Sequence, residues 1–63
     1  MKCLREFRKA QKWTQEEFAK RADISKNYVY MLESGRVRPS VSLAKRLGKL
    51  MDVDWRTLFE DET

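Results

Sequence analysis

Histidine is absent from the 63-residue chain, and cysteine occurs once, as Cys3. A single cysteine cannot form an internal disulfide. Without histidine, the chain lacks the commonest metal ligand and the commonest general base. The adjacent Glu16 and Glu17 point in different directions on a helix, and no glycine-rich phosphate-binding loop is present. We therefore expect no enzymatic activity, no metal site and no cofactor.

Long hydrophobic runs are also missing. No stretch is apolar enough to cross a bilayer and no secretory signal peptide follows Met1, so we expect a cytoplasmic protein with no membrane partner. The length predicts one domain over residues 1–63, which at this size buries only about 60% of the surface of its unfolded chain. Such a domain needs tight helix packing or a partner, and it has no room for a small-molecule substrate.

Acidic residues are scarce except near the end of the chain. The formal net charge is +4, with residues 1–12 and 25–51 strongly basic and residues 52–62 mostly acidic. A basic body with an acidic tail suits a polyanionic partner such as nucleic acid. A solvated surface of mixed sign is the alternative that the charge pattern leaves open.

Glycine and proline are rare, with two residues and one residue, and no alternating strand pattern persists. The hydrophobic periodicity instead predicts an all-α protein. We expect a compact bundle of about five short helices over residues 2–11, 14–22, 25–34, 40–51 and 54–60. The predicted core consists of Leu4, Phe7, Trp13, Phe18, Ala19, Ala22, Ile24, Val29, Leu32, Val41, Leu43, Leu47, Leu50, Val53 and Leu58.

The second and third helices have clear start and stop signals. Thr14 and Glu17 have the spacing of a capping box, in which each side chain binds the backbone of the other residue. Ser25 is a favourable N-cap for the third helix. Gly35 suits the left-handed residue that ends it.

The fourth and fifth helices carry other local signals. Gly48 lies inside the fourth helix, where glycine costs about 1 kcal/mol relative to alanine, so we expect close packing there. Asp54 is placed to cap the fifth helix. Val53 and Leu58 have the spacing of a hydrophobic staple across that cap.

The third helix has two unlike faces. At about 100° per residue, Val29 and Leu32 lie on one side as apolar anchors. The opposite side carries Lys26, Asn27, Tyr30, Met31 and Ser34. Lysine donates to guanine, asparagine pairs with adenine, and Tyr30 and Met31 suit a thymine methyl group. Two short helices joined by a tight turn over residues 14–34 therefore indicate a helix-turn-helix, with an ordinary solvated face as the alternative.

Residues 4–59 resemble the phage repressor and Cro-like helix-turn-helix family, also called the XRE family. The matching segments are residues 13–19, 22–25, 28–29, 32–35 and 39–40. The resemblance implies the lambda-repressor-like helix-turn-helix fold. Asp23 departs from the family pattern, which usually has glycine in the turn. Aspartate tolerates a left-handed backbone better than most residues, so we expect the turn to form at some cost in stability.

The resemblance also implies roles for individual residues. It places base reading at Lys26, Asn27, Tyr30 and Met31, although base preferences do not transfer. It places contacts to DNA phosphates at Gln15, Ser34, Arg36, Arg38 and Lys12. A salt bridge between Arg8 and Glu33 is implied to tie the third helix to the first, as a structural contact.

By resemblance, the chain is a DNA-binding transcriptional regulator, a repressor that inserts residues 25–34 into the major groove of a palindromic operator on double-stranded DNA. Such proteins usually bind as homodimers, and Trp55 and Phe59 of the fifth helix form the candidate dimer surface. A cover over the end of the bundle is the alternative for Trp55. An antitoxin-like or other protein-interaction module on the same fold is the alternative function.

Overall fold

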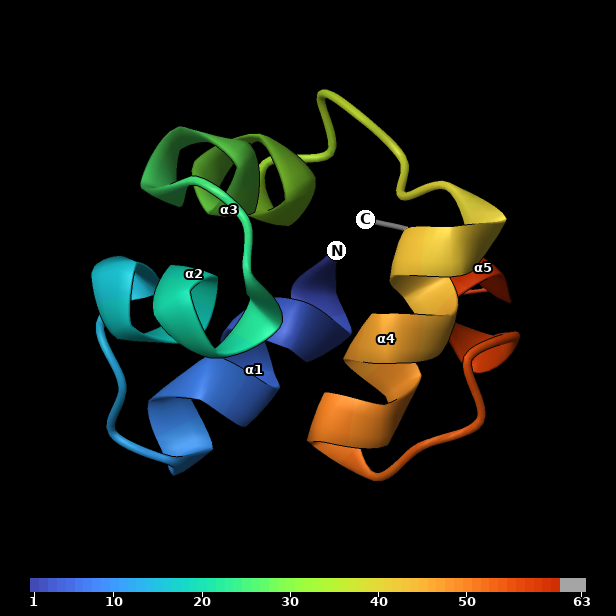
Figure 1. The fold of residues 1–63 in the computed structure, drawn as a ribbon, viewed down its shortest axis with the longest axis horizontal. Coiled ribbons are helices and arrows are strands. Elements are labelled where there is room, and N and C mark those ends of the chain that lie inside the picture. Colours follow the sequence, from blue (N-terminus) through green and yellow to red (C-terminus); the bar gives the residue numbers. More distant parts are fainter. Residues whose placement is uncertain (61–63) are drawn as a thin grey trace.

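A computed structural model describes residues 1–60, although not the side chain of Glu60, and within this range it contains five helices and no strand. They are α1 (Lys2–Ala10), α2 (Gln15–Ala22), α3 (Lys26–Glu33), α4 (Val41–Met51) and α5 (Thr57–Glu60). In Figure 1, α3 lies along the top of the molecule, α1 and α2 lie below it, and α4 stands beside them with α5 at its back. The predicted all-α bundle is confirmed. The last acidic residues, at positions 61 and 62, lie outside the described residues.

Side-chain caps begin three of the helices, as the sequence predicts for two of them. The backbone N–H of Glu17 donates to Thr14 Oγ1 at 3.1 Å, and the backbone N–H of Thr14 donates to Glu17 Oε1 at 2.8 Å. Ser25 Oγ accepts from the backbone N–H of Tyr28 at 3.0 Å, and Ser40 caps α4 in the same way at 3.1 Å. These bonds satisfy N–H groups that a helix start otherwise leaves without partners.

Four helix ends share one geometry, a residue with positive φ followed by a hydrogen bond to a carbonyl five residues back. The residues are Lys12 (φ 62°), Asp23 (φ 59°), Gly35 (φ 81°) and Asp52 (φ 58°). At the end of α2, for example, the N–H of Ile24 donates to the carbonyl of Ala19 at 3.0 Å. This is the Schellman arrangement. The turn therefore forms with Asp23 in the left-handed conformation, as expected.

Asp23→Gly is expected to raise the free energy of unfolding by about 0.5–1 kcal/mol, because glycine adopts positive φ without the clash that a Cβ brings. The Asp23 side chain is 99% exposed, so the change removes no packing. Asp23→Ala is the matched control, and it should be less stable than the glycine variant. Urea unfolding measures both, and equal stabilities would contradict backbone strain at this position.

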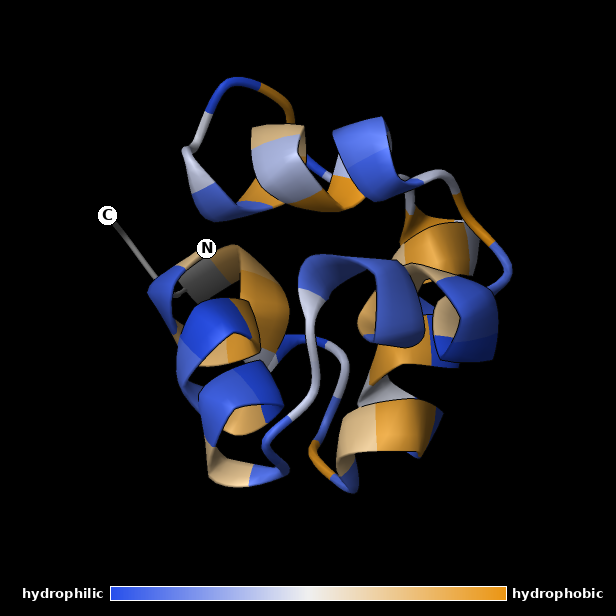
Figure 2. Ribbon diagram, turned by 90° about the vertical axis from the view of Figure 1, so that its left-hand side faces the viewer, coloured by the Kyte–Doolittle hydropathy of each residue, from blue (hydrophilic) through white to orange (hydrophobic). Residues whose placement is uncertain are grey.

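The core lies where α1, α2, α3 and α4 meet. Its buried apolar residues are Met1, Leu4, Phe18, Ala19, Ala22, Val29, Leu32, Leu43, Ala44, Leu47, Met51 and Leu58. Half-buried residues border it, including Phe7, Trp13, Ile24 and Leu50. Figure 2 shows that the apolar positions of α3 face the other helices. None of the helices within residues 1–60 combines the length and apolar composition that crossing a bilayer requires.

Two predicted core residues are wrong, because Val41 and Val53 are 53% and 43% exposed. Val41 is the first residue of α4, so its side chain lies at an end of the bundle rather than between helices. Val53 follows the left-handed Asp52, and its backbone carbonyl faces Gly48 of α4. The side chain of Val53 is therefore turned toward solvent and does not reach the core.

The start of α5 also differs from the prediction, because the helix begins at Thr57 rather than near Asp54. The Asp54 carboxylate instead closes a turn, accepting from the backbone N–H of Arg56 at 3.0 Å and from its guanidinium at 2.9 Å. These hydrogen bonds hold the pKa of Asp54 below its ordinary value. A local turn of this kind competes with a helix cap for the same carboxylate.

Gly48 allows the chain after α4 to pack directly against the helix. A Cβ added at this position would lie only 2.9 Å from the carbonyl oxygen of Val53 and 3.0 Å from Cβ of Trp55. The close packing expected from the sequence is therefore confirmed. The contact explains why a residue with poor helix propensity lies inside α4.

Gly48→Ala should gain about 1 kcal/mol of helix propensity but lose more to overcrowding, which costs about 1–3 kcal/mol when backbone atoms must shift. We expect a net fall in melting temperature of several degrees. Lys49→Ala, at the exposed neighbouring position, is the control and should melt near the parent temperature. A Gly48→Ala variant more stable than the parent would show that the segment after α4 yields freely.

Candidate nucleic-acid interface

One face of α3 is exposed to solvent, and the opposite face is buried. Val29 and Leu32 are completely buried on its inner side. On the outer side, Lys26 and Asn27 are exposed and Tyr30 is 48% exposed. Met31 is half-buried, so it contributes less surface than the other three residues assigned to base reading. The structure thus brings the four predicted residues to one side of α3.

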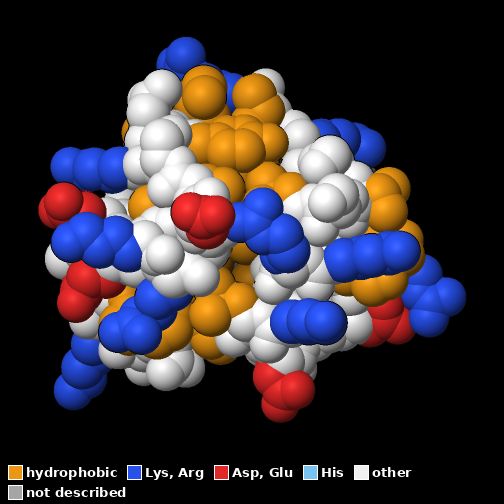
Figure 3. Space-filling model, viewed as in Figure 1, with side chains coloured by type: hydrophobic (Ala, Val, Ile, Leu, Met, Phe, Trp, Pro, Cys, Tyr) orange, Lys and Arg blue, Asp and Glu red, His pale blue; other side chains and the backbone are white. Residues whose placement is uncertain are grey.

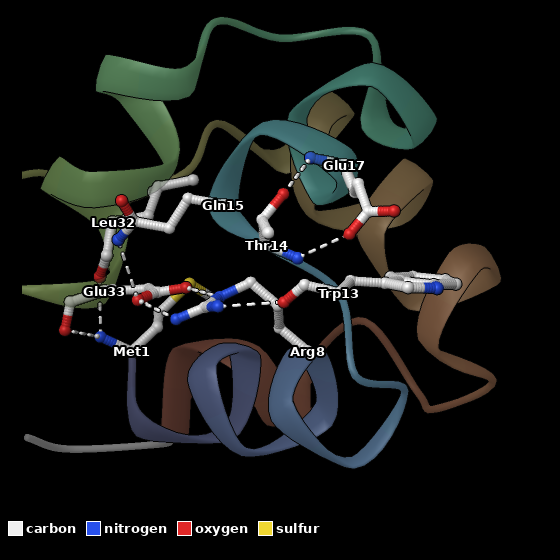
Figure 4. A network of polar contacts seen from close by, with 8 residues as sticks. All are labelled: Met1, Arg8, Trp13, Thr14, Gln15, Glu17, Leu32 and Glu33. Carbon is white, nitrogen blue, oxygen red and sulfur yellow. Dashed lines mark hydrogen bonds and ion pairs between the residues drawn. The ribbon is translucent and has the colours of Figure 1, made fainter.

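A polar network fixes the carboxyl end of α3 against α1 (Figure 4). Arg8 Nε donates to Glu33 Oε2 at 2.7 Å, and Arg8 Nη2 donates to Glu33 Oε1 at 3.2 Å. The same guanidinium donates to the carbonyl of Trp13 at 3.0 Å, which joins the α1–α2 turn to the network. A two-point contact between arginine and a carboxylate sets the orientation of both groups.

Gln15, the first residue of α2, joins the same network. Its Nε2 donates to Glu33 Oε1 at 3.2 Å, so it braces α3 from the α2 side. The side chain is half-buried rather than enclosed. The position of Gln15 therefore leaves part of its side chain accessible to a DNA phosphate while the amide stays hydrogen-bonded to Glu33 of α3.

The α-amino group of Met1 also contacts the end of α3. It donates to the carbonyl oxygens of Leu32, at 2.6 Å, and Glu33, at 3.3 Å. A positive charge is favourable beside the carboxyl end of a helix, where carbonyl groups lack partners. The buried Met1 was absent from the predicted core, because no local pattern relates residue 1 to residue 32.

The Arg8–Glu33 pair is shielded from water, with side-chain exposures of 13% and 6%. Removing one partner from such a pair strands a buried charge, at a cost of about 3–5 kcal/mol. Glu33→Leu should therefore be strongly destabilised, and the double variant Arg8→Met/Glu33→Leu should be more stable than Glu33→Leu alone. Urea unfolding of the four chains of this cycle measures the coupling. If the effects of the two changes on the free energy of unfolding were additive, Arg8 and Glu33 would not stabilise the fold through their mutual contact.

Gln15 lines two shallow hollows, and each hollow is also lined by residues predicted to contact DNA. One is lined by Lys26 together with Thr14, Glu16 and Arg8. The other lies between α1 and the second half of α3, and its lining residues are Arg5, Arg8, Lys9, Gln15, Tyr30, Glu33 and Ser34. Sequence reasoning did not single out Arg5 and Lys9. Their spacing of four residues puts them on one face of α1, but only the packing of α1 shows which element that face adjoins.

The other predicted phosphate-contacting residues are more dispersed. Ser34 is exposed, and its hydroxyl donates to the carbonyl of Met31 at 3.1 Å. Arg36 and Arg38 are exposed in the loop between α3 and α4. Lys12 is exposed in the turn between α1 and α2 and lines neither of the two hollows at α3. On the face shown in Figure 3, lysine and arginine side chains lie at the top, left and right edges and near the centre, with carboxylates among them and at the bottom edge.

Trp55 and Phe59, the residues assigned to a dimer surface, are both half-buried. Their rings meet edge to face with centroids 6.0 Å apart, and Lys45 Nζ lies 5.4 Å from the Trp55 ring. Trp55 therefore packs against α4 beside Lys45 and Gly48 and also keeps part of its surface exposed. Next to it, Val53 adds exposed apolar surface.

These features define a helix-turn-helix domain: two short helices joined by a tight turn, with the second held rigidly and its polar face free. A helix-turn-helix family model matches residues 4–58 of the chain. The chain belongs to the Cro/C1-type (XRE) helix-turn-helix family of DNA-binding transcriptional regulators. The family resemblance found in the sequence is thereby confirmed.

Several relatives carry the same designation. The chain is 42% identical over 60 residues to YqaF, an HTH-type transcriptional regulator of Bacillus subtilis strain 168, covering 95% of this chain and 79% of that protein. It is 33% identical over 61 residues to an HTH-type transcriptional regulator of Archaeoglobus fulgidus, covering 94% of this chain and 87% of that protein. No solved structure matches the chain.

Proposed function

We propose that this protein is a repressor that binds a palindromic operator as a homodimer, with α3 of each copy in the major groove. The observation that carries the proposal is the exposed face of α3, where Lys26, Asn27 and Tyr30 project from a helix whose opposite side is buried. An α-helix fits the major groove of B-DNA, and these side chains match donor and acceptor groups of base edges. Met31 borders this face and completes the assigned set.

Phosphate contacts orient the helix and carry little sequence information. We assign them to Gln15 and Ser34 at the two ends of the α2–α3 unit, to Arg36 and Arg38 in the following loop, and to Lys12. The shielded Arg8–Glu33 pair fixes α3 relative to Gln15. A phosphate held by Gln15 and a base read by Asn27 therefore keep a constant separation.

Homodimer formation rests on size and on exposed apolar surface. A single α3 spans only a few base pairs, whereas two copies related by a twofold axis read half-sites about 34 Å apart. Trp55 and Phe59, with the 43%-exposed Val53 beside them, provide apolar surface on the side of the molecule formed by the end of α4 and by α5. A twofold contact uses the same patch on both copies.

The test is selection of bound sequences from a random duplex DNA pool at about 0.15 M salt, because specific binding must survive physiological ionic strength. The parent chain should enrich an inverted repeat. Asn27→Ala should lose about 1–3 kcal/mol of discrimination at one position of each half-site while its melting temperature stays within a few degrees of the parent. Gln11→Ala, which removes an exposed amide after α1, is the control and should select the parent repeat.

The outcome of the selection distinguishes the proposed dimeric repressor from its alternatives. Enrichment of single half-sites would contradict the dimer and leave α3 as the reading helix. No enrichment, with only weak salt-sensitive binding, would favour the protein-interaction module on the same fold. A large fall in melting temperature on Asn27→Ala would contradict its assignment as a base-reading residue.

A further inference from the structure

The hollow between α1 and the second half of α3, called here the α1–α3 groove, carries unbalanced positive charge. Its lining includes Arg5, Arg8, Lys9, Tyr30, Glu33 and Ser34. Arg8 and Glu33 neutralise each other in a shielded pair, so the groove retains two cations and no free carboxylate. These cations are Arg5 and Lys9, both of which are exposed.

Neither cation has a partner in the described part of the chain. No ion pair or side-chain hydrogen bond joins Arg5 or Lys9 to another residue among positions 1–60. They lie four residues apart on α1, which places their side chains one above the other on the same face. The pair thus forms a short positive row along one wall of the groove.

This row adjoins the proposed reading helix. Tyr30 lines the α1–α3 groove and also belongs to the exposed face of α3. When a helix lies in the major groove, which is about 12 Å wide, the phosphate backbones run along both of its sides. The side of α3 next to α1 therefore faces one backbone, at the level of Tyr30 and Ser34.

We propose that Arg5 and Lys9 bind phosphates of the operator strand that runs along the α1 side of α3. The inference rests on the proposed function and extends the DNA interface from α2 and α3 to α1. The two cations add affinity for every duplex and little sequence preference, because phosphates carry no base information. The competing role for the two cations is stabilisation of the carboxyl end of α3 by nearby positive charge. The experiment distinguishes this role from phosphate binding.

The experiment compares Lys9→Gln with Lys20→Gln. Both lysines are exposed, and both lie in the last turn of an eight- or nine-residue helix, so each change removes one positive charge from the last turn of a helix. Lys20 lines a different hollow, with Glu17 and Arg21. Affinity for the selected operator is measured as a function of salt concentration, together with the melting temperature of each free protein.

Lys9→Gln should lower the slope of log affinity against log salt by about 0.9, the value for one lost phosphate contact, and Arg5→Gln/Lys9→Gln should lower it by about 1.8. The loss should be similar for operator and for unrelated duplex DNA. Lys20→Gln should keep the slope and the melting temperature of the parent chain.

Equal slopes for Lys9→Gln and Lys20→Gln would overturn the proposal while leaving the proposed function intact. A lower melting temperature with an unchanged slope would assign Arg5 and Lys9 to the stability of α3 instead. If the parent chain shows no salt-dependent binding to duplex DNA, the proposed function and this inference both fall.

Discussion

The shielded ion pair between Arg8 and Glu33 is the contact on which the arrangement of this small domain depends. It spans 25 positions of the sequence and joins the first helix to the helix that carries the exposed polar face. Gln15 and the carbonyl of Trp13 complete its hydrogen bonding, and no buried side-chain polar atom among the described residues lacks a partner. A fully satisfied network of this kind favours one orientation of α3 over its neighbours.

The structure separates the residues that hold α3 from those that project from it. Val29, Leu32 and Glu33 fix the helix, whereas Lys26 and Asn27 contribute little to the core. The exposed positions are thus available for substitution without rearranging the fold. A single scaffold can then carry different donor and acceptor patterns on this face of α3.

Local signals were readable from the sequence, and contacts between distant segments were not. The capping box of Thr14 follows from four consecutive residues, so its prediction depends on no other helix. Val53 was assigned to the core on spacing alone, but the packing of the backbone against α4 turns its side chain outward. The Asp54 carboxylate was predicted to cap α5, but in the structure it closes a turn with Arg56 instead. The proximity of Lys9 to Tyr30 requires knowing how α1 crosses α3, which periodicity within one helix does not specify.

The repeated left-handed helix ends have a kinetic consequence. Lys12, Asp23, Gly35 and Asp52 reverse the chain at intervals of 11 to 17 residues, and most residue contacts join positions that are close in sequence. Between helices, α2 packs mainly against α3, α1 packs against α3, and α4 packs against α2. Chains dominated by such short-range contacts fold in microseconds to milliseconds. A newly synthesised copy therefore reaches its native structure much faster than ribosomes add residues, at about 5–20 per second. The packing of α1 against α3 and of α2 against α4 must wait until the later helix of each pair has been made.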